Sequence, residues 1–290
     1  MSSSILFGQA LVNGLVIGMM YMLMAVGFTL VFGIMRVVNF AHGEFYMLGA
    51  FVGVFTYAQW QLPFIVCLAI SALAVGLFGA VLERVVLRNF RQDEGLAMIA
   101  SLGLALVIQN GALLLWGATP RSVPDVVSGS VAIGPFTFSA GRLMVIAIAA
   151  VLFAAFWYFM QHTQTGRAMR AVAQDSETAL MQGVRIERIY PFAFGLSVAF
   201  AAIAGTLMGP IFSVSPFVGH TPMLKSFVVV ILGGLGSIPG AVLGALVLGV
   251  LESFTAIIWG AAVSDLLVLG LVILILLVRP WGLMGQKEYV

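Results

Sequence analysis

Long apolar runs separated by short polar interruptions organise this chain. A helix needs about 20 mostly apolar residues to cross a bilayer, and most of these runs reach or approach that length. The runs cover 8–33, 43–58, 63–87, 96–117, 141–161, 190–212 and 264–279, and a composite apolar region covers 223–258. The pattern predicts an all-α, polytopic bundle of about eight or nine transmembrane spans, some of them broken or re-entrant.

Composition supports a membrane protein. Hydrophobic residues make up 62% of the 290 positions and the mean hydropathy is +1.13, whereas soluble domains are near half apolar. We therefore expect one transmembrane domain over 1–290. The N-terminal letters MSSSILFGQ lack a basic segment, so the first run is interpreted as a membrane span and not as a cleaved signal.

The first polar interruption, Arg36–Gly49 (RVVNFAHGEFYMLG), carries Asn39, His42 and Glu44 in a chain with only 8% charged residues. It is either a tight loop at a membrane face or a helix break inside the membrane. Broken backbone cannot face lipid, because its N–H and C=O groups would be unpaired. Ionisable groups at membrane depth are costly and favour a functional interpretation.

Three roles can be considered for these side chains, and the first is not supported. One His-x-Glu supplies at most two metal ligands and no second cluster accompanies it, so neither a metal site nor a catalytic residue is predicted. Asn39 is a possible helix N-cap, with Glu44 in the first turn. Alternatively, Asn39, His42 and Glu44 line a translocation path or its gate, which is compatible with capping.

Arginine-bearing segments predict the orientation. They contain Arg84, Arg88 and Arg91, then Arg167, Arg170, Arg185 and Arg188, and finally Arg279 and Lys287. The positive-inside rule places all three segments in the cytoplasm, and the long, nearly uncharged loop 118–140 outside. The region 223–258 must then start and finish outside, as a hairpin or re-entrant pair. The N-terminus is outside, and 36–44 is cytoplasmic, if 8–33 and 43–58 both cross fully.

A second interruption, Gly233–Gly240 (GGLGSIPG), divides the region 223–258. Its first arm, 223–232, is too short to cross unless it begins earlier or stops partway. The order of helix, break and small-residue helix is similar around VNFAHGE and GGLGSIPG, either by chance or as an internal repeat. Paired broken helices point to a transport site. Candidate path or gate residues therefore include Gly233, Gly234, Gly236, Ser237 and Pro239.

The most charged stretch is Gly166–Pro191. Acidic residues at Asp175 and Glu177, followed by Gly183, predict a short helix. It docks on a cytoplasmic partner, or it is a solvated loop that contacts anionic lipid through Arg167 and Arg170. The chain contains no G-x-x-x-x-G-K-[ST] motif, so any ATPase that drives it is on another polypeptide.

Three segments carry a family resemblance: VNFAHGEFYMLGAF at 38–51, GRAMRAVAQDSETALMQGV at 166–184 and GGLGSIPGAVLGALVLGVLE at 233–252. They resemble the LivH-type permeases, membrane subunits of bacterial branched-chain amino acid ABC importers. The resemblance covers nearly the whole chain and implies the ABC importer permease fold. It also implies an inner-membrane location, a LivM-like second permease, two cytoplasmic ATPases and a periplasmic binding protein facing loop 118–140.

The resemblance also makes Ala173–Gly183 the expected coupling helix. Glu177, Ala179 and Gly183 follow an E-A-A-x-x-x-G pattern, from which Thr178 departs. The implied ATPase-coupling residues are Gly166, Arg167, Arg170, Asp175, Glu177, Ala179 and Gly183. No cofactor is expected on this chain, because the partners use the ATP.

The substrate class is less sharply predicted. Branched-chain or other hydrophobic amino acids are expected, and urea, short amides or small carboxylates are alternatives carried by related importers. A stand-alone carrier with His42 and Glu44 as a proton relay is a further alternative. The net charge of +2 does not indicate nucleic-acid binding.

Overall fold

The computed structural model describes residues 3–91, 93–133 and 136–285. Apolar sequence with few breakers forms helix throughout, as the apolar runs predict. The long helices are α1 (Ser3–Met35), α3 (Phe64–Val85), α4 (Glu94–Trp116), α5 (Ala140–His162), α8 (Ile186–Met208), α10 (Ile238–Trp259) and α11 (Ala261–Val278). The shorter ones are α2 (His42–Gly53), continued by the π-helix η1 (Val54–Gln59), the 3₁₀-helix η2 (Leu87–Phe90), α6 (Gln164–Gln174), α7 (Ser176–Met181) and α9 (His220–Gly233).

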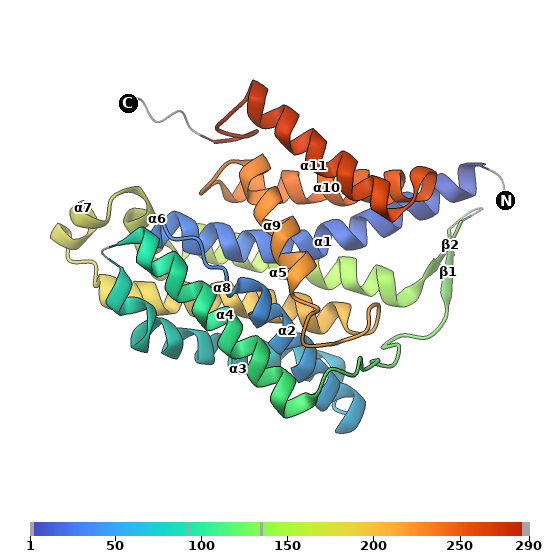
Figure 1. Ribbon diagram of the computed structural model, residues 1–290, viewed down its shortest axis with the longest axis horizontal. Coiled ribbons are helices and arrows are strands. Elements are labelled where there is room, and N and C mark those ends of the chain that lie inside the picture. The colour runs from blue at the N-terminus through green and yellow to red at the C-terminus, as the bar shows by residue number, and fades with distance from the viewer. Residues whose placement is uncertain (1–2, 92, 134–135, 286–290) are drawn as a thin grey trace.

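The bundle has two distinct ends (Figure 1). One, here the α7 end, carries α6 and α7, and the other, the hairpin end, carries strands β1 (Ser130–Ile133) and β2 (Phe136–Ser139). The strands pair antiparallel, with Val131 opposite Phe138. This hairpin lies within loop 118–140, where the sequence analysis predicted no strand. Helix α1 starts at the hairpin end and α11 finishes at the α7 end.

Seven helices in the described part of the chain are long and apolar enough to cross a membrane. The predicted span 190–212 is α8, which lies four residues earlier. The predicted count of about eight or nine spans differs slightly, because it included 43–58 and the first arm of 223–258. Those stretches form α2 with η1, and α9, and neither α2 nor α9 reaches the length of a spanning helix.

Helix α2 begins inside the bundle, not at its face. After α1 ends at the α7 end, residues 36–41 fold back between the helices, and His42 reaches the carbonyl oxygen of Met24, 3.1 Å from its Nε2. Next to His42, Gly27 accepts a 2.7 Å hydrogen bond from Ser197, which lies midway along α8. From this half-depth position α2 runs to the hairpin end, where the Tyr57 hydroxyl donates to the Asp125 carbonyl at 3.4 Å.

Helix α9 is the counterpart of α2. Residues 209–219 descend from the hairpin end of α8, and Gly219 reaches Gly43, where an added Cβ would lie 2.6 Å from the Gly219 carbonyl oxygen. From that contact α9 runs the opposite way, to the α7 end, where Gly236 lies against Gly33 near the end of α1. The two short helices therefore start side by side at half depth and point to opposite ends of the bundle.

This arrangement corrects the proposed pairing of the two breaks. The sequence matched VNFAHGE with GGLGSIPG, but the segment equivalent to VNFAHGE is 209–219, before α9. The unit α1–α2–α3 corresponds to α8–α9–α10 in the opposite direction, and α10 packs along α1 as α3 packs along α8. The predicted re-entrant pair in 223–258 is present as α9 and α10, and GGLGSIPG is the turn between them.

Helices α1 and α8 form the centre of the bundle. In α8, 83% of the span is buried, against 17% in peripheral α11. Glycines make the close contacts. At Gly49 of α2 and Gly205 of α8, the facing backbones leave no room for a Cβ, which is the role that small residues have in membrane helix packing.

Replacement of Gly49 by Leu is expected to separate α2 from α8 and to destabilise the protein by about 1–3 kcal/mol or more, because overpacking a tight contact forces backbone shifts. The measurement is the monodisperse fraction after detergent extraction and gel filtration. Gly103→Leu is the matched control, because no atom lies within 4 Å of a Cβ built there. Equal recovery of both variants would contradict this packing.

Candidate functional site

The polar residues predicted at the first interruption lie in the interior. Asn39, His42 and Glu44 are all buried. Asn39 is not the N-cap, because α2 is preceded by Ala41 and has no side-chain cap; the Asn39 Oδ1 instead accepts from the Ala41 N–H at 3.1 Å. Glu44 does lie in the first turn of α2, as expected.

Several polar atoms around this half-depth point have no hydrogen-bond partner among the described residues. They are His42 Nδ1, Glu44 Oε2 and Asn39 Nδ2, together with Thr29 Oγ1 of α1 and Ser226 Oγ of α9. A buried polar group left unpaired costs about 1–3 kcal/mol. Each such group calls for an explanation, and here the groups belong to α1, the segment 36–41, α2 and α9.

A small cavity lies beside Asn39, on its α7-end side. Its volume is about 30 Å³, and its lining includes Asn39, Ser101 of α4, Arg91 and Tyr190, enough for about one water. Arg91 is ion-paired with the buried Glu83 and stacks over the Tyr190 ring at 4.7 Å. The cavity therefore connects the interior segment 36–41 with the polar α7 end.

The second candidate break is a turn at the α7 end. Gly234 and Gly236 have φ values of +103° and +82°, a region that favours glycine. Ser237 caps α10 by accepting from the Gly240 N–H at 3.2 Å, and Pro239 lies in the first turn. Gly233 accepts a 3.0 Å hydrogen bond from the Met284 N–H. The structure does not bring this turn to His42, because the 14 residues of α9, about 21 Å of helix, separate them.

The predicted short helix in Gly166–Pro191 is α7, and it protrudes from the bundle (Figure 1). Asp175 caps it, accepting from the N–H groups of Glu177 and Thr178 at 2.9 and 3.1 Å. Hydrogen bonds from Thr178 lower the pKa of Asp175, so the cap is intact at neutral pH and is lost only as the pH falls through that lowered value. Gly183 ends the turn with φ +83°.

Some of the other predicted coupling residues are buried and some are exposed. Gly166 is packed against the end of α5, and Ala179 is the buried residue of α7. Arg167 and Glu177 are exposed, and Arg170 is partly buried. Helix α6 was not predicted, although Gly166, Met169 and Val172 are buried at helical spacing. The exposed apolar tip of α7, Leu180 and Met181, was not predicted either.

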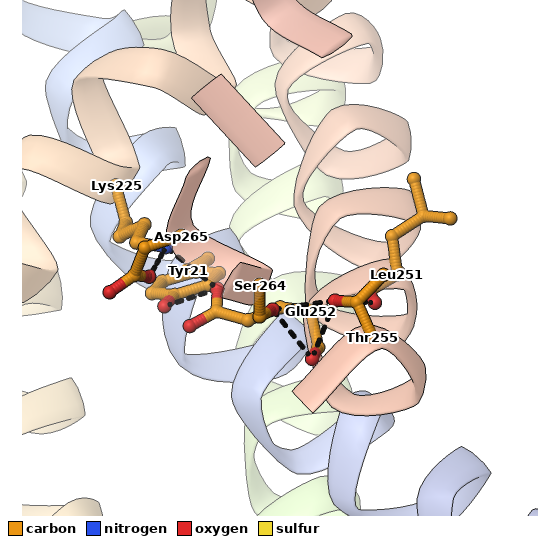
Figure 2. A network of polar contacts seen from close by, with 7 residues as sticks. All are labelled: Tyr21, Lys225, Leu251, Glu252, Thr255, Ser264 and Asp265. Carbon is orange, nitrogen blue, oxygen red and sulfur yellow. Dashed lines mark hydrogen bonds and ion pairs between the residues drawn. The ribbon is translucent and has the colours of Figure 1, made fainter. Parts of the chain in front are cut away.

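A polar network that the sequence analysis did not identify ties four helices together (Figure 2). Lys225 of α9 lies 3.3 Å from Glu252 Oε2 of α10 and 2.6 Å from Asp265 Oδ1 of α11. Tyr21 of α1 donates to Glu252 at 2.9 Å, and Ser264 of α11 donates to the Glu252 carbonyl at 3.0 Å. No group of three His, Cys, Asp or Glu residues in the described part of the chain is arranged to hold a metal ion.

Comparison with known proteins identifies the class. Residues 10–277 match the family model described as "Branched-chain amino acid transport system / permease component". The chain is 34% identical to the high-affinity branched-chain amino acid transport system permease protein BraD of Pseudomonas aeruginosa, over 97% of this chain and 96% of that protein. It is also 34% identical to LivH of Escherichia coli K12, with the same coverage.

A partial match extends to sugar permeases. The fructose import permease protein FrcC of Rhizobium meliloti is 35% identical over 41% of this chain and 34% of that protein. No solved structure gave a significant match. This chain belongs to the branched-chain amino acid transport permease family, and it is a polytopic protein of the inner membrane.

Removal of the lysine in Figure 2 is expected to destabilise the bundle. The Lys225 and Glu252 side chains are only 12% and 18% exposed, so Lys225→Met leaves Glu252 without a positive partner at a cost of about 3–5 kcal/mol. Thermal unfolding in detergent measures the loss. Lys225→Met combined with Glu252→Gln should recover most of it.

Asp265→Asn is the control, because the Asp265 side chain is 63% exposed and exposed pairs are worth about 0–1 kcal/mol. A Lys225→Met protein as stable as the unaltered one would show that the network does not hold the four helices.

Proposed function

We propose that this chain is the permease subunit of an ATP-driven importer that carries branched-chain amino acids across the inner membrane. The observation that carries the proposal is the similarity, along nearly the whole chain, to permease proteins of branched-chain amino acid transport systems. The chain contains no phosphate-binding motif, so ATP hydrolysis belongs to separate subunits.

The proposed orientation has the α7 end in the cytoplasm. Arg88 pairs with Glu187 at the start of α8, at 2.7 Å, and Arg167 and Arg279 belong to segments at the same end. Clustering of arginines at one end is the pattern of a cytoplasmic face. The hairpin and the rest of 118–140 then face the periplasm, where a binding protein delivers the substrate.

Helix α7 is the proposed contact with a cytoplasmic ATPase. It protrudes, and it offers one carboxylate and an apolar tip, because Glu177, Leu180 and Met181 are exposed while Ala179 fastens it to the bundle. A short helix of this kind fits a groove on a partner. Asp175, Gly166 and Gly183 support its shape, and Arg167 and Arg170 flank it.

The proposed path involves the half-depth point where α2 and α9 start. Phe217, His220 and Thr221 are exposed there, on and beside the irregular segment 209–219. Non-helical backbone at membrane depth is tolerated only when protein covers it or water fills the space beside it. A second permease subunit on this face, with the path between the two, meets that requirement. Asn39, His42 and Glu44 are the gate residues behind it.

The mechanism follows from a shift between two states. ATP binding brings the ATPases together and moves α7 together with α8. Helix α8 is hydrogen-bonded to Gly27 of α1 and packs against α2. The α9–α10 turn, from Gly233 through Gly234 and Gly236 to Ser237 and Pro239, moves with the end of α1. Nucleotide and loaded binding protein bias the states only through their different affinities for them.

Glu177→Arg is expected to reduce leucine uptake about tenfold or more, because a like-charge contact in an interface costs several kcal/mol. ATP hydrolysis by the assembled transporter should no longer respond to loaded binding protein. Glu94→Arg, also exposed and at the α7 end, is the control. Normal uptake by the Glu177 variant would rule out α7 as the coupling contact.

Glu44→Gln is expected to lower uptake about tenfold, because it keeps the volume of the side chain but removes the ionisable carboxyl group from the proposed gate. The amount of protein in the membrane should not change. Uptake is compared with Glu94→Gln at equal expression. Full activity of the Glu44 variant would assign Glu44 to packing alone.

A further inference from the structure

A second cavity lies at the hairpin end, far from Asn39. Its volume is about 210 Å³, well above the volume that a single water needs. Three segments form it: the loop before β1 with Asp125 and Val126, the start of α5 with Arg142 and Val145, and the end of α8 with Leu207 and Ile211. We call it the hairpin-end cavity.

Two opposite charges line the hairpin-end cavity without pairing. Asp125 and Arg142 both face it, yet no ion pair joins them among the described residues. The Arg142 side chain donates to the Asn13 side chain of α1. The backbone carbonyl of Asp125 accepts from Tyr57 at 3.4 Å, and the Asp125 residue is exposed. An arginine binds a carboxylate through parallel hydrogen bonds, and an aspartate binds an ammonium group. The two groups together complement a zwitterion.

The remaining walls of the cavity are mainly apolar. Val126, Val145, Leu207 and Ile211 contribute aliphatic surface, and Val145 and Leu207 are themselves buried. Pockets for small molecules combine such surface with a few polar groups that fix orientation. An aliphatic side chain fits between these residues, and a polar one loses its hydration there without a hydrogen-bond partner.

The start of α5 adds partial positive charge to the side of the cavity that Arg142 lines. Ser139 precedes α5 but makes no side-chain cap, and Gly141 beside it also lines the cavity. The N-terminal end of a helix carries partial positive charge, which adds to that of Arg142. A carboxylate at this end therefore meets both.

The cavity is also at the head of the proposed path. Pro210 and Ile211 line it and begin the segment 209–219 that descends to α9. Arg121 fixes that segment through two 2.8 Å backbone hydrogen bonds with Val214. The cavity thus adjoins the start of the irregular segment that leads to half depth.

From these observations we infer that the hairpin-end cavity is a loading site for an aliphatic α-amino acid, with Arg142 binding the carboxylate, Asp125 the ammonium and Leu207 and Ile211 the side chain. The inference rests on the proposed function and extends it, because it places substrate selection on the permease as well as on the binding protein. Both charges of the ligand are required.

Equilibrium binding of radiolabelled L-leucine to the full-length chain, in nanodiscs with its partner permease, tests the inference. Competing isocaproate lacks the ammonium, isoamylamine lacks the carboxylate and glycine lacks the aliphatic side chain. Each is expected to bind about tenfold or more weaker than leucine. No leucine binding, or equal competition by isocaproate or isoamylamine, would overturn the inference.

Variants locate the site. Arg142→Gln and Asp125→Asn should each weaken leucine binding about tenfold to a hundredfold, with Arg142→Lys intermediate. Arg185→Gln and Asp265→Asn, both exposed and outside the cavity, are the matched controls, and gel filtration verifies that all variants fold. Unchanged binding in both cavity variants would remove the site from this cavity.

Uptake by the complete transporter separates this inference from the proposed function. If the unaltered chain supports leucine uptake while the cavity variants bind leucine normally, only the loading site is wrong. If the unaltered chain supports no uptake of any aliphatic amino acid, the proposed function itself fails.

Discussion

The fold depends on one constraint: backbone that leaves the helical conformation inside a membrane must still have its hydrogen bonds satisfied. Two segments meet this constraint in different ways. In 36–41, the Phe40 N–H donates to Ser101 of α4 at 3.0 Å, and the side chain of Asn39 accepts from Ala41. In 209–219, Val214 pairs with Arg121 from the external loop. The two irregular segments therefore depend on other elements, α4 and the loop 118–140, for part of their hydrogen bonding.

Both segments bring a helix start to the same point. Gly43 and Gly219 meet backbone to backbone, with the side chain of Met223 of α9 also against Gly43, and α2 and α9 share few other contacts. Elsewhere the helix pairs pack along most of their length. Gly14 and Gly18 of α1 lie against the α10 backbone, as Gly76 of α3 lies against Gly195 of α8. The rigid pairs α1–α10 and α3–α8 therefore surround a central pair that is joined more loosely, an organisation expected of inverted repeats in transporters.

Sequence patterns predicted most of the helices, because run length and apolar composition determine whether a helix can span a bilayer. They also predicted a polar interruption of the apolar runs at 36–44 and a short helix after Asp175. They could not predict that 36–41 turns back to Met24, since that depends on a carbonyl of another helix and on Ser101, sixty residues away. The counterpart segment 209–219 was missed for a similar reason. It has no ionisable residue before His220, so its polar content did not distinguish it from a loop, and GGLGSIPG attracted the assignment instead. The charged network of Lys225, Glu252 and Asp265 was missed because its members are far apart in the sequence.

Several residues are exposed at half depth, on and beside the irregular segment 209–219. A chain that completed the path alone would bury Phe217, His220 and Thr221, but these residues are exposed beside irregular backbone. Lipid cannot satisfy that backbone. Asn39, His42 and Glu44, by contrast, are buried inside the chain. One chain thus combines buried polar residues with an uncovered wall, an arrangement that fits the proposed second permease subunit on the opposite side. Movement of α9 against α2 would then change the width of the space between the subunits without exposing either gate to lipid.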